Sequence, residues 1–468
     1  MNDISLADRS DENQSISQQL GAFAQALTWA DIPEEAREYA KHLILDGIGI
    51  AFASSRYDFA QVTLEALLRF GGGSSVAIGF ANRLSIRDAV LLNGVLIHGI
   101  DYDDTHLVSV VHPTSSCLPT ALLAADLDLS GRDLLLAYIL GIEVAARIGA
   151  VAKGELNQSG FHPTGLVAAF GTAVAAGKLY GLDADQMTNA QGIVLSMASG
   201  TREYSSEGAW TKRLHPGWAG VSGITSASLA KSGFVAPTRA YEGKFGLYAT
   251  HLGAKMAAVD LSYATSALGK RWEVTQVAVK PYPSGQFGIS CIDAALVLRA
   301  RHEIDPAEIE SVEVAIPPHA VAIMLEPLEK RRRPHSSYSA QFSIPFLVSA
   351  ALSYGRLSPA ELELYEKPEL LQLADRVDYR VDHETDYPRH FPCRMTIVLK
   401  SGQRLVHDEA INRGSADRPV LPAEIDKKYY DNMAAIVPRS RADEIRDAVM
   451  RLDGGGSAKD LAEKLSGE

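Results

Sequence analysis

Cysteine is scarce in this chain of 468 residues, which contains only Cys117, Cys291 and Cys393. Three scattered cysteines are too few for a disulfide framework, and their spacing does not match that of a structural zinc site. The first residues, MNDISLADRSDENQS, are polar and acidic and lack the apolar stretch of a secretory signal peptide. We therefore expect a protein of the reducing cytoplasm.

Long apolar runs and an excess of basic residues are also absent. The mean hydropathy is −0.02, and no window of about 18 uncharged apolar residues, the length of a membrane-spanning helix, occurs. Acidic residues outnumber basic ones by 57 to 45, and the resulting net charge of −12 argues against nucleic-acid binding. We expect neither a membrane nor a nucleic acid as partner. A site for an anion in such a chain must gather its positive charge locally.

Two common catalytic signatures are missing as well. No Gly-x-Ser-x-Gly segment marks a nucleophilic serine. The glycine runs Gly71–Gly73 and Gly454–Gly456 lack the context of a phosphate-binding loop. The hydrophobic fraction of 46% is nevertheless ordinary for a globular protein and excludes a disordered scaffold.

The first half of the sequence predicts one helix after another. Apolar residues recur at helical spacing from about residue 16 to 265, most clearly over 36–53, 86–100, 116–128, 133–149, 163–180, 184–199 and 217–232. Several of these segments are apolar on more than one face, which is typical of helices buried among other helices. We expect residues 1–15 to be disordered.

The pattern changes near residue 270. Alternating segments at 274–279, 309–316, 393–399 and 404–406 predict strands, and Lys400–Gln403 is a good hairpin turn between the last two. Helical patterns at 288–302 and 339–353 lie between them, and helices return over 422–453 and 458–465. The chain therefore predicts a mainly α-helical domain built from both chain ends, residues 16–268 and 406–468, with an inserted smaller α+β domain over 269–405.

Two histidine-containing motifs could carry chemistry. His98–Thr105 (HGIDYDDT), followed by His112, places three carboxylates within four residues. Such a cluster suits a Mg²⁺ site, acid–base work with a raised carboxylate pKa, or a helix end with solvated acids. His162 stands just before Pro163 at a helix start, where the dipole lowers an imidazole pKa and free N–H groups can hold an anion. A packed histidine is the simpler interpretation of that second motif.

Two basic motifs follow. Thr211–Gly217 (TKRLHPG) brings Lys212, Arg213 and His215 within four residues and fits either a carboxylate-binding patch or a solvated turn. Lys280–Pro283 (KPYP) ends the segment 274–279, and its prolines stiffen the backbone that carries Lys280. An ordinary strand exit explains this last motif equally simply.

In this order the motifs resemble those of the MmgE/PrpD family, which includes 2-methylcitrate dehydratases, cis-aconitate decarboxylases and iminodisuccinate epimerases. The resemblance covers about residues 20 to 435. The matching segments are Leu45–Gly47, Asn93-Gly94, His98–Thr105, His112-Pro113, Gly160–Thr164, Thr211–Gly217, Lys280–Pro283, Ile292–Ala294 and Ala340–Ser343. It implies a helical domain with a smaller α+β lid, a homodimer, and activity without a metal or an organic cofactor.

The resemblance also implies a site in a cleft between the domains. The family's positions fall on Asp101, Thr105, His112, His162, Lys212 and Lys280. Lys212 and Lys280 would neutralise the carboxylates of a small polycarboxylate substrate, with Thr105 beside them. His162 would be the leading acid–base group with His112 assisting, and Asp101 would orient a partner or act as base.

The leading functional prediction is thus a cofactor-independent hydro-lyase similar to 2-methylcitrate dehydratase. Decarboxylation or epimerisation of a related polycarboxylate is the alternative among enzymes. A non-catalytic dimeric paralogue and a Mg²⁺-dependent diphosphate enzyme represent two other classes. One departure bears on the substrate: Ser290-Cys291 stands where many family members carry Thr-His or a similar polar pair, which casts doubt on 2-methylcitrate.

Overall fold

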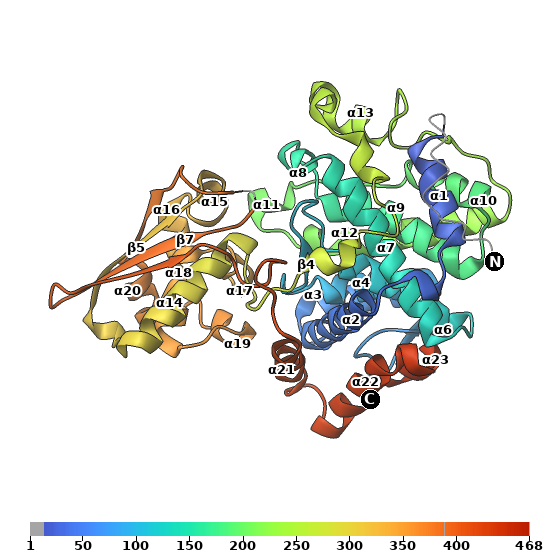
Figure 1. Cartoon of the computed structure of the whole chain (residues 1–468). Helices are drawn as coiled ribbons and strands as arrows, with labels where there is room; N and C mark the ends of the chain where they lie inside the picture. The colour runs from blue at the N-terminus through green and yellow to red at the C-terminus, as the bar shows by residue number, and fades with distance from the viewer. Residues whose placement is uncertain (1–13, 388, 468) are drawn as a thin grey trace.

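The computed structural model describes residues 14–387 and 389–467, and these residues form two large hydrophobic clusters (Figure 1). The larger cluster is helical and takes residues from the first 279 positions and from the C-terminal helices. The smaller cluster runs from Tyr282 to Leu405 and contains the four-stranded sheet. The limits of the domains predicted at residues 268 and 405 remain a prediction, although Trp272, Val274, Val277 and Val279 belong to the larger cluster.

Long helices with small residues form the centre of the larger cluster. α9 (Pro163–Tyr180) is buried along nearly its whole length and packs against α7 (Gly131–Val151) and α12 (Thr211–Lys231). The helices approach closely because Gly171 leaves room: a Cβ there would lie 2.3 Å from the carbonyl oxygen of Gly141. α2 (Glu34–Ser54) and α4 (Ile86–Ile97) complete this core.

The remaining elements of the first 270 residues are shorter. They are α1 (Ile16–Ala26), α3 (Asp58–Leu68), β1 (Ser75–Val76), β2 (Arg83–Leu84), β3 (Thr105–His106), α5 (Thr114–Ala121), α6 (Leu123–Asp126), α8 (Glu155–Gln158), α10 (Ala184–Val194), α11 (Tyr204–Glu207) and α13 (Leu247–Leu252).

Most of the predicted helices are present, and several of them differ from the prediction in their bounds. The segment 116–128 is divided into α5 and α6. The helix predicted over 184–199 ends at Val194. α12 begins at Thr211, six residues before the predicted start and despite Pro216, so the basic motif occupies the first turns of a helix and is not a turn between helices.

A mixed sheet organises the smaller cluster. Its strands have the order β6-β5-β7-β8, with β5 (Ile309–Ile316) parallel to β6 (Val377–Val381) and antiparallel to β7 (Cys393–Leu399), and β7 antiparallel to β8 (Arg404–Glu409). The helices of this part are α14 (Ile289–His302), α15 (Pro318–Met324), α16 (Leu328–Arg332), α17 (Ser337–Ala340), α18 (Ile344–Tyr354), α19 (Pro359–Leu362) and α20 (Pro368–Ala374). In Figure 1 they lie with the orange strands, away from the body of long helices.

The strand predictions are confirmed for β5, β7 and the hairpin into β8. The turn depends on Gly402, whose φ of 83° is left-handed. The strand predicted over 274–279 is confirmed only at β4 (Val277–Ala278). A 3₁₀ turn, η4 (Glu273–Gln276), occupies the first half of the predicted segment. β4 pairs with β3 and not with the sheet, because Val274 and Val277 are buried among the long helices.

Both chain ends contribute to the larger cluster. The C-terminal helices α21 (Pro422–Met433), α22 (Arg439–Met450) and α23 (Ala458–Lys464) follow the sheet, and α21 packs on α2. Lys428 of α21 is buried: its Nζ lies 2.8 Å from Asp46 Oδ1 and donates to the carbonyl oxygens of Tyr102 and Lys280 at 2.9 Å. One side chain therefore joins four segments.

Two predictions about special segments need comment. Most of the segment 1–15, predicted to be disordered, lies outside the described residues, but Ser15 is buried and caps α1. By length and composition α7 could cross a membrane, although all of its apolar window is buried inside the protein.

The Lys428 contact makes a prediction about stability. Lys428→Met leaves the buried Asp46 carboxylate without its partner, and we expect a loss of roughly 3–5 kcal/mol in the free energy of unfolding. Denaturant unfolding at neutral pH measures this loss. Lys427→Met is the matched control, because it removes the same charge from the same helix but breaks only the exposed Lys427–Asp431 pair. This variant should lose less than about 1 kcal/mol in the free energy of unfolding. Equal losses in the two variants would refute the assignment.

Candidate active site

The loop after α4 places Asp101 between two lysines. Asp101 has a left-handed φ of 50°, a conformation that aspartate adopts more readily than most residues. Its Oδ2 lies 2.8 Å from Lys212 Nζ in the first turn of α12, and its Oδ1 lies 2.8 Å from Lys280 Nζ just after β4. Lys280 Nζ also donates to the Asp101 carbonyl oxygen at 2.9 Å. We call these three residues the ion triad.

The ion triad is buried and charged. Burial by itself raises the pKa of the Asp101 carboxyl, but the nearby charges of Lys212 and Lys280 outweigh it and hold that pKa well below its usual range. Burial lowers the pKa of Lys212, and the Asp101 carboxylate reverses this and raises it above the ordinary value. Asp101 is thus an ionised orienting group and not a base with a raised pKa. One carboxylate between two ammonium groups leaves an excess positive charge.

Four histidines lie beside the ion triad. The ring centroids of His98 and His112 are 4.8 Å apart, those of His98 and His162 5.6 Å, and those of His112 and His162 6.0 Å. His162 is the N-cap of α9 with Pro163 in its first turn, as predicted, and its Nδ1 lies 3.0 Å from Nδ1 of His215 on α12. His98, His112 and His162 together are called the histidine cluster below.

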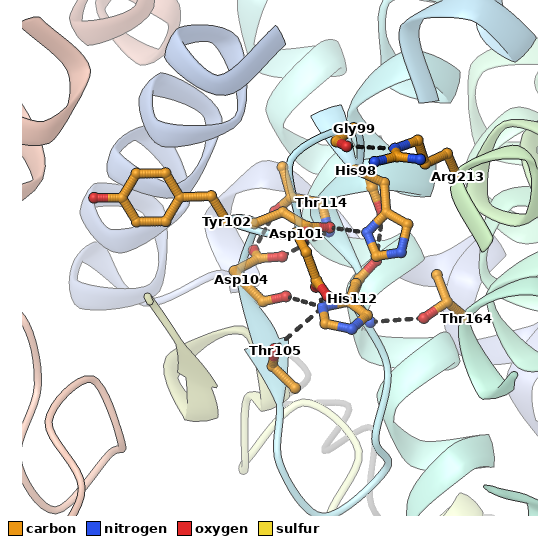
Figure 2. Close-up of polar contacts among 12 residues, drawn as sticks. His98, Gly99, Asp101, Tyr102, Asp104, Thr105, His112, Thr114, Thr164 and Arg213 are labelled. Atoms are coloured by element: carbon orange, nitrogen blue, oxygen red, sulfur yellow. Dashed lines mark hydrogen bonds and ion pairs between the residues drawn. The ribbon is translucent and has the colours of Figure 1, made fainter. Parts of the chain in front are cut away.

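The Nδ1 atoms of His98 and His112 are held by acceptors on the same loop (Figure 2). His98 Nδ1 lies 2.7 Å from Asp103 Oδ2. His112 Nδ1 lies 2.7 Å from the carbonyl oxygen of Asp104 and 3.1 Å from Thr105 Oγ1. The backbone N–H of His112 donates to Thr164 Oγ1, which ties the loop to α9.

His112, His162 and His215 are neutral at physiological pH. Burial is the main cause: it lowers the pKa of His112 to about 3 and that of His215 to about 4, with help from the charge of Lys212. Burial also holds the pKa of His162 well below its ordinary value, reinforced by His98 and Lys212. Neutral imidazoles can accept protons, and a polyanion bound among them would raise their pKa values again.

The three crowded carboxylates are separated by their partners. The Asp101 carboxylate pairs with Lys212 and Lys280, and the Asp103 carboxylate pairs with His98. Burial by itself raises the pKa of Asp103, but His98 helps to hold that pKa below its usual value. The Asp104 carboxylate accepts a hydrogen bond from Thr114 Oγ1. Burial raises the pKa of Asp104 to about 8. Each of the three carboxylates therefore has its own protein partner.

Residues from both parts of the chain contact the loop or its neighbours. Gln341, from the smaller cluster's part of the chain, donates to the carbonyl oxygen of Ile100 at 2.8 Å. Arg213 donates to the Gly99 carbonyl oxygen, and its guanidinium lies 4.5 Å from the ring centroid of Phe59 and 4.4 Å from that of Tyr338. The site therefore lies where the long helices meet the sheet-containing part.

The six residues named from the sequence are near one another. Asp101, Lys212 and Lys280 form the ion triad, Thr105 contacts His112, and His98 joins the two groups because it approaches Asp101, His112 and His162. Ser290 and Cys291 are buried on α14, and Ser290 donates to the Phe391 carbonyl oxygen.

Four contributors were missed as site residues. His98 and Asp103 lie inside the motif HGIDYDDT, and their separation by five residues in a loop gave no sign that they pair. His215 follows Lys212 by three positions, about one helical turn, so the two side chains share one face of a helix. This spacing would have pointed to His215 if the segment had been predicted as a helix. Lys428 has no local signal, because its partners lie 148 to 382 positions away.

Two models of one protein family match the two parts of the chain. The MmgE/PrpD N-terminal domain matches residues 18–259, and the MmgE/PrpD C-terminal domain matches residues 282–454. Together the two matches cover most of the chain. The chain belongs to the MmgE/PrpD family.

Several curated relatives span nearly the whole chain. A cis-aconitate decarboxylase-like protein, oryM, of Aspergillus oryzae is 25% identical over 97% of this chain and 98% of its own. Cis-aconitate decarboxylases of Aspergillus terreus and Mus musculus are each 26% identical, over 95% and 97% of this chain and 94% and 96% of their own.

The buried histidines predict a loss of stability in mild acid. His112 binds a proton near pH 6.5 in the unfolded chain but only near pH 3 in the folded one, so the unfolded state binds more protons between these values. Stability therefore falls as the pH drops through this window. His112→Gln should flatten the slope of unfolding free energy against pH by up to about 1.4 kcal/mol per pH unit. Denaturant unfolding at a series of pH values tests this, and above pH 7 the two curves should run parallel. An unchanged acid slope would contradict the assignment.

Proposed function

We propose that this protein is a cofactor-independent lyase that acts on a small di- or tricarboxylate by proton transfer next to a carboxylate. The observation that carries the proposal is the ion triad beside neutral, buried histidines. The family, and relatives named as cis-aconitate decarboxylases, support it.

Substrate binding would use the excess positive charge of the ion triad. A substrate carboxylate that approaches Lys212 and Lys280 meets two ammonium groups already fixed by Asp101, so little rotamer entropy is lost on binding. The same groups can stabilise negative charge that develops on the substrate in a site with little water. Thr105, next to His112, can donate or accept a hydrogen bond with the bound acid.

Proton transfer falls to the histidines. The negative charge of a polycarboxylate raises the pKa of His162 and His112, so these neutral groups can take up protons when substrate binds. In decarboxylation, a carbon–carboxylate bond breaks, its electron pair is delocalised onto a remaining conjugated carboxylate, CO₂ leaves, and an imidazolium delivers a proton to carbon. His162 is the leading candidate for that donor, with His112 assisting.

Decarboxylation of cis-aconitate is our first choice of reaction, because the relatives carry that name. Dehydration of 2-methylcitrate, the leading prediction from the motifs, needs the same groups: a base removes the proton next to a carboxylate, and an acid protonates the leaving hydroxyl. Epimerisation uses proton removal and return alone. The cytoplasmic location and the homodimer are further proposals from the family resemblance.

One assay separates these reactions. The purified protein is incubated in deuterated buffer with EDTA and a panel of cis-aconitate, 2-methylcitrate, citrate, malate, tartrate and iminodisuccinate, and products are followed by NMR. We expect CO₂ loss from cis-aconitate, with deuterium on the product carbon that took up the proton. A new vinyl signal from a hydroxy acid would instead identify dehydration, and deuterium exchange with inversion of the exchanging stereocentre would identify epimerisation. No turnover of any member would contradict the proposal.

His162 has its own prediction. His162→Gln should lower kcat by roughly 10²–10⁴-fold on the substrate identified above, because it removes the proton donor while it preserves the size of the side chain. Steady-state kinetics measure the loss, and circular dichroism verifies the fold. The exposed His302 provides a control: His302→Gln should leave kcat unchanged. A near-normal kcat for His162→Gln would remove it from the mechanism.

A further inference from the structure

The histidine cluster has a property that acid–base chemistry does not require. One ligand atom from each of His98, His112 and His162 lies within 4.8 Å of the others, and all three residues are buried. The three imidazoles come from the end of α4, from the loop before α5 and from the start of α9.

The contacts at Nδ1 fix the tautomers of neutral His98 and His112. The partners of His98 Nδ1 and His112 Nδ1 are the Asp103 carboxylate and the Asp104 carbonyl oxygen, which are acceptors only. In the neutral form of each ring Nδ1 therefore carries the hydrogen, and Nε2 keeps a free lone pair. His162 Nδ1 is also occupied, by His215. Each ring is held through Nδ1 in the way that metal-binding histidines are oriented.

The inner nitrogens are left without protein partners. The Nε2 atoms of His98 and His162 are buried and have no hydrogen-bond partner among the described residues. A buried nitrogen without a partner carries a cost in free energy, and a bound ligand would remove it. Neutral imidazole is a good ligand for Zn²⁺ and related transition metals and a poor one for Mg²⁺.

We propose that His98, His112 and His162 form a binding site for a divalent transition-metal ion of the Zn²⁺ class, with a fourth position open to water or a substrate carboxylate. The carboxylates of Asp101 and Asp103 lie close enough to His98 to balance part of the ion's charge. The metal is not a cofactor here, because binding would occupy the lone pairs of the two proposed acid–base histidines. Zn²⁺ is therefore a reversible inhibitor, a consequence that rests on the proposed function, whereas binding itself does not.

Binding is tested on untagged, chelator-treated protein by titration with Zn²⁺ against a chromophoric chelator and with Co²⁺ by absorption spectroscopy. We expect one equivalent of Zn²⁺, and a Co²⁺ spectrum of nitrogen and oxygen ligands. Asp103→Asn should weaken binding by roughly 10–100-fold through the orientation of His98, and His98→Asn should weaken it further. His302→Asn, on the exposed end of α14, should leave it unchanged. Thermal unfolding verifies that each variant is folded.

Three results would overturn the site: no binding by the native protein, binding that survives both His98→Asn and His162→Asn, or a sulfur-to-cobalt band. The last would place the ion at the buried Cys291 and Cys393, which lie next to each other. Once a substrate is known, Zn²⁺ should abolish turnover and a chelator should restore it. Stoichiometric binding without inhibition would refute the inhibitory role alone. A protein that binds Zn²⁺ but turns over no substrate would refute the proposed function and leave the metal site intact.

Discussion

The Asp101 carboxylate between the ammonium groups of Lys212 and Lys280 is the interaction on which the rest of the site depends. It joins residues that lie 111 and 179 positions apart in the chain, on a loop, a helix start and the segment after β4. A buried lysine without a counter-charge would lose its proton or destabilise the fold. A single carboxylate stabilises both lysines, but it neutralises only one of their two charges. A chain with a net charge of −12 needs such a local positive charge to bind a polycarboxylate.

Local periodicity predicted most of the secondary structure, because its causes are local. Strands such as Ile309–Ile316 alternate in burial, and helices such as Pro163–Tyr180 begin and end at proline and glycine. The strand predicted over 274–279 was confirmed only in part for a tertiary reason: its valines alternate as in a strand, but they are buried against helices, and only two residues pair with β3. β6 was missed because it has one fully buried residue, Val377, and so a weak alternation.

The site was predictable only in part, and through resemblance more than through spacing. The motifs identified which residues to consider, and the contacts of Asp101 then decided its role, since two lysines lower its pKa where burial alone would have raised it. Contacts between distant segments could not be predicted. His98 belongs to the site because α4 ends beside α9, and Lys428 because α21 packs on α2. No local pattern encodes either contact.

The central claim is that the ion triad and the histidine cluster form one polycarboxylate site. A crystal structure with propane-1,2,3-tricarboxylate, a saturated tricarboxylate that cannot react as cis-aconitate does, tests it most directly. The account predicts one carboxylate within about 2.7–3.2 Å of Nζ of Lys212 and Lys280, with the carbon chain facing His112 and His162. A ligand bound away from Asp101 would contradict the account. So would a histidine cluster that binds no ligand at saturating concentration.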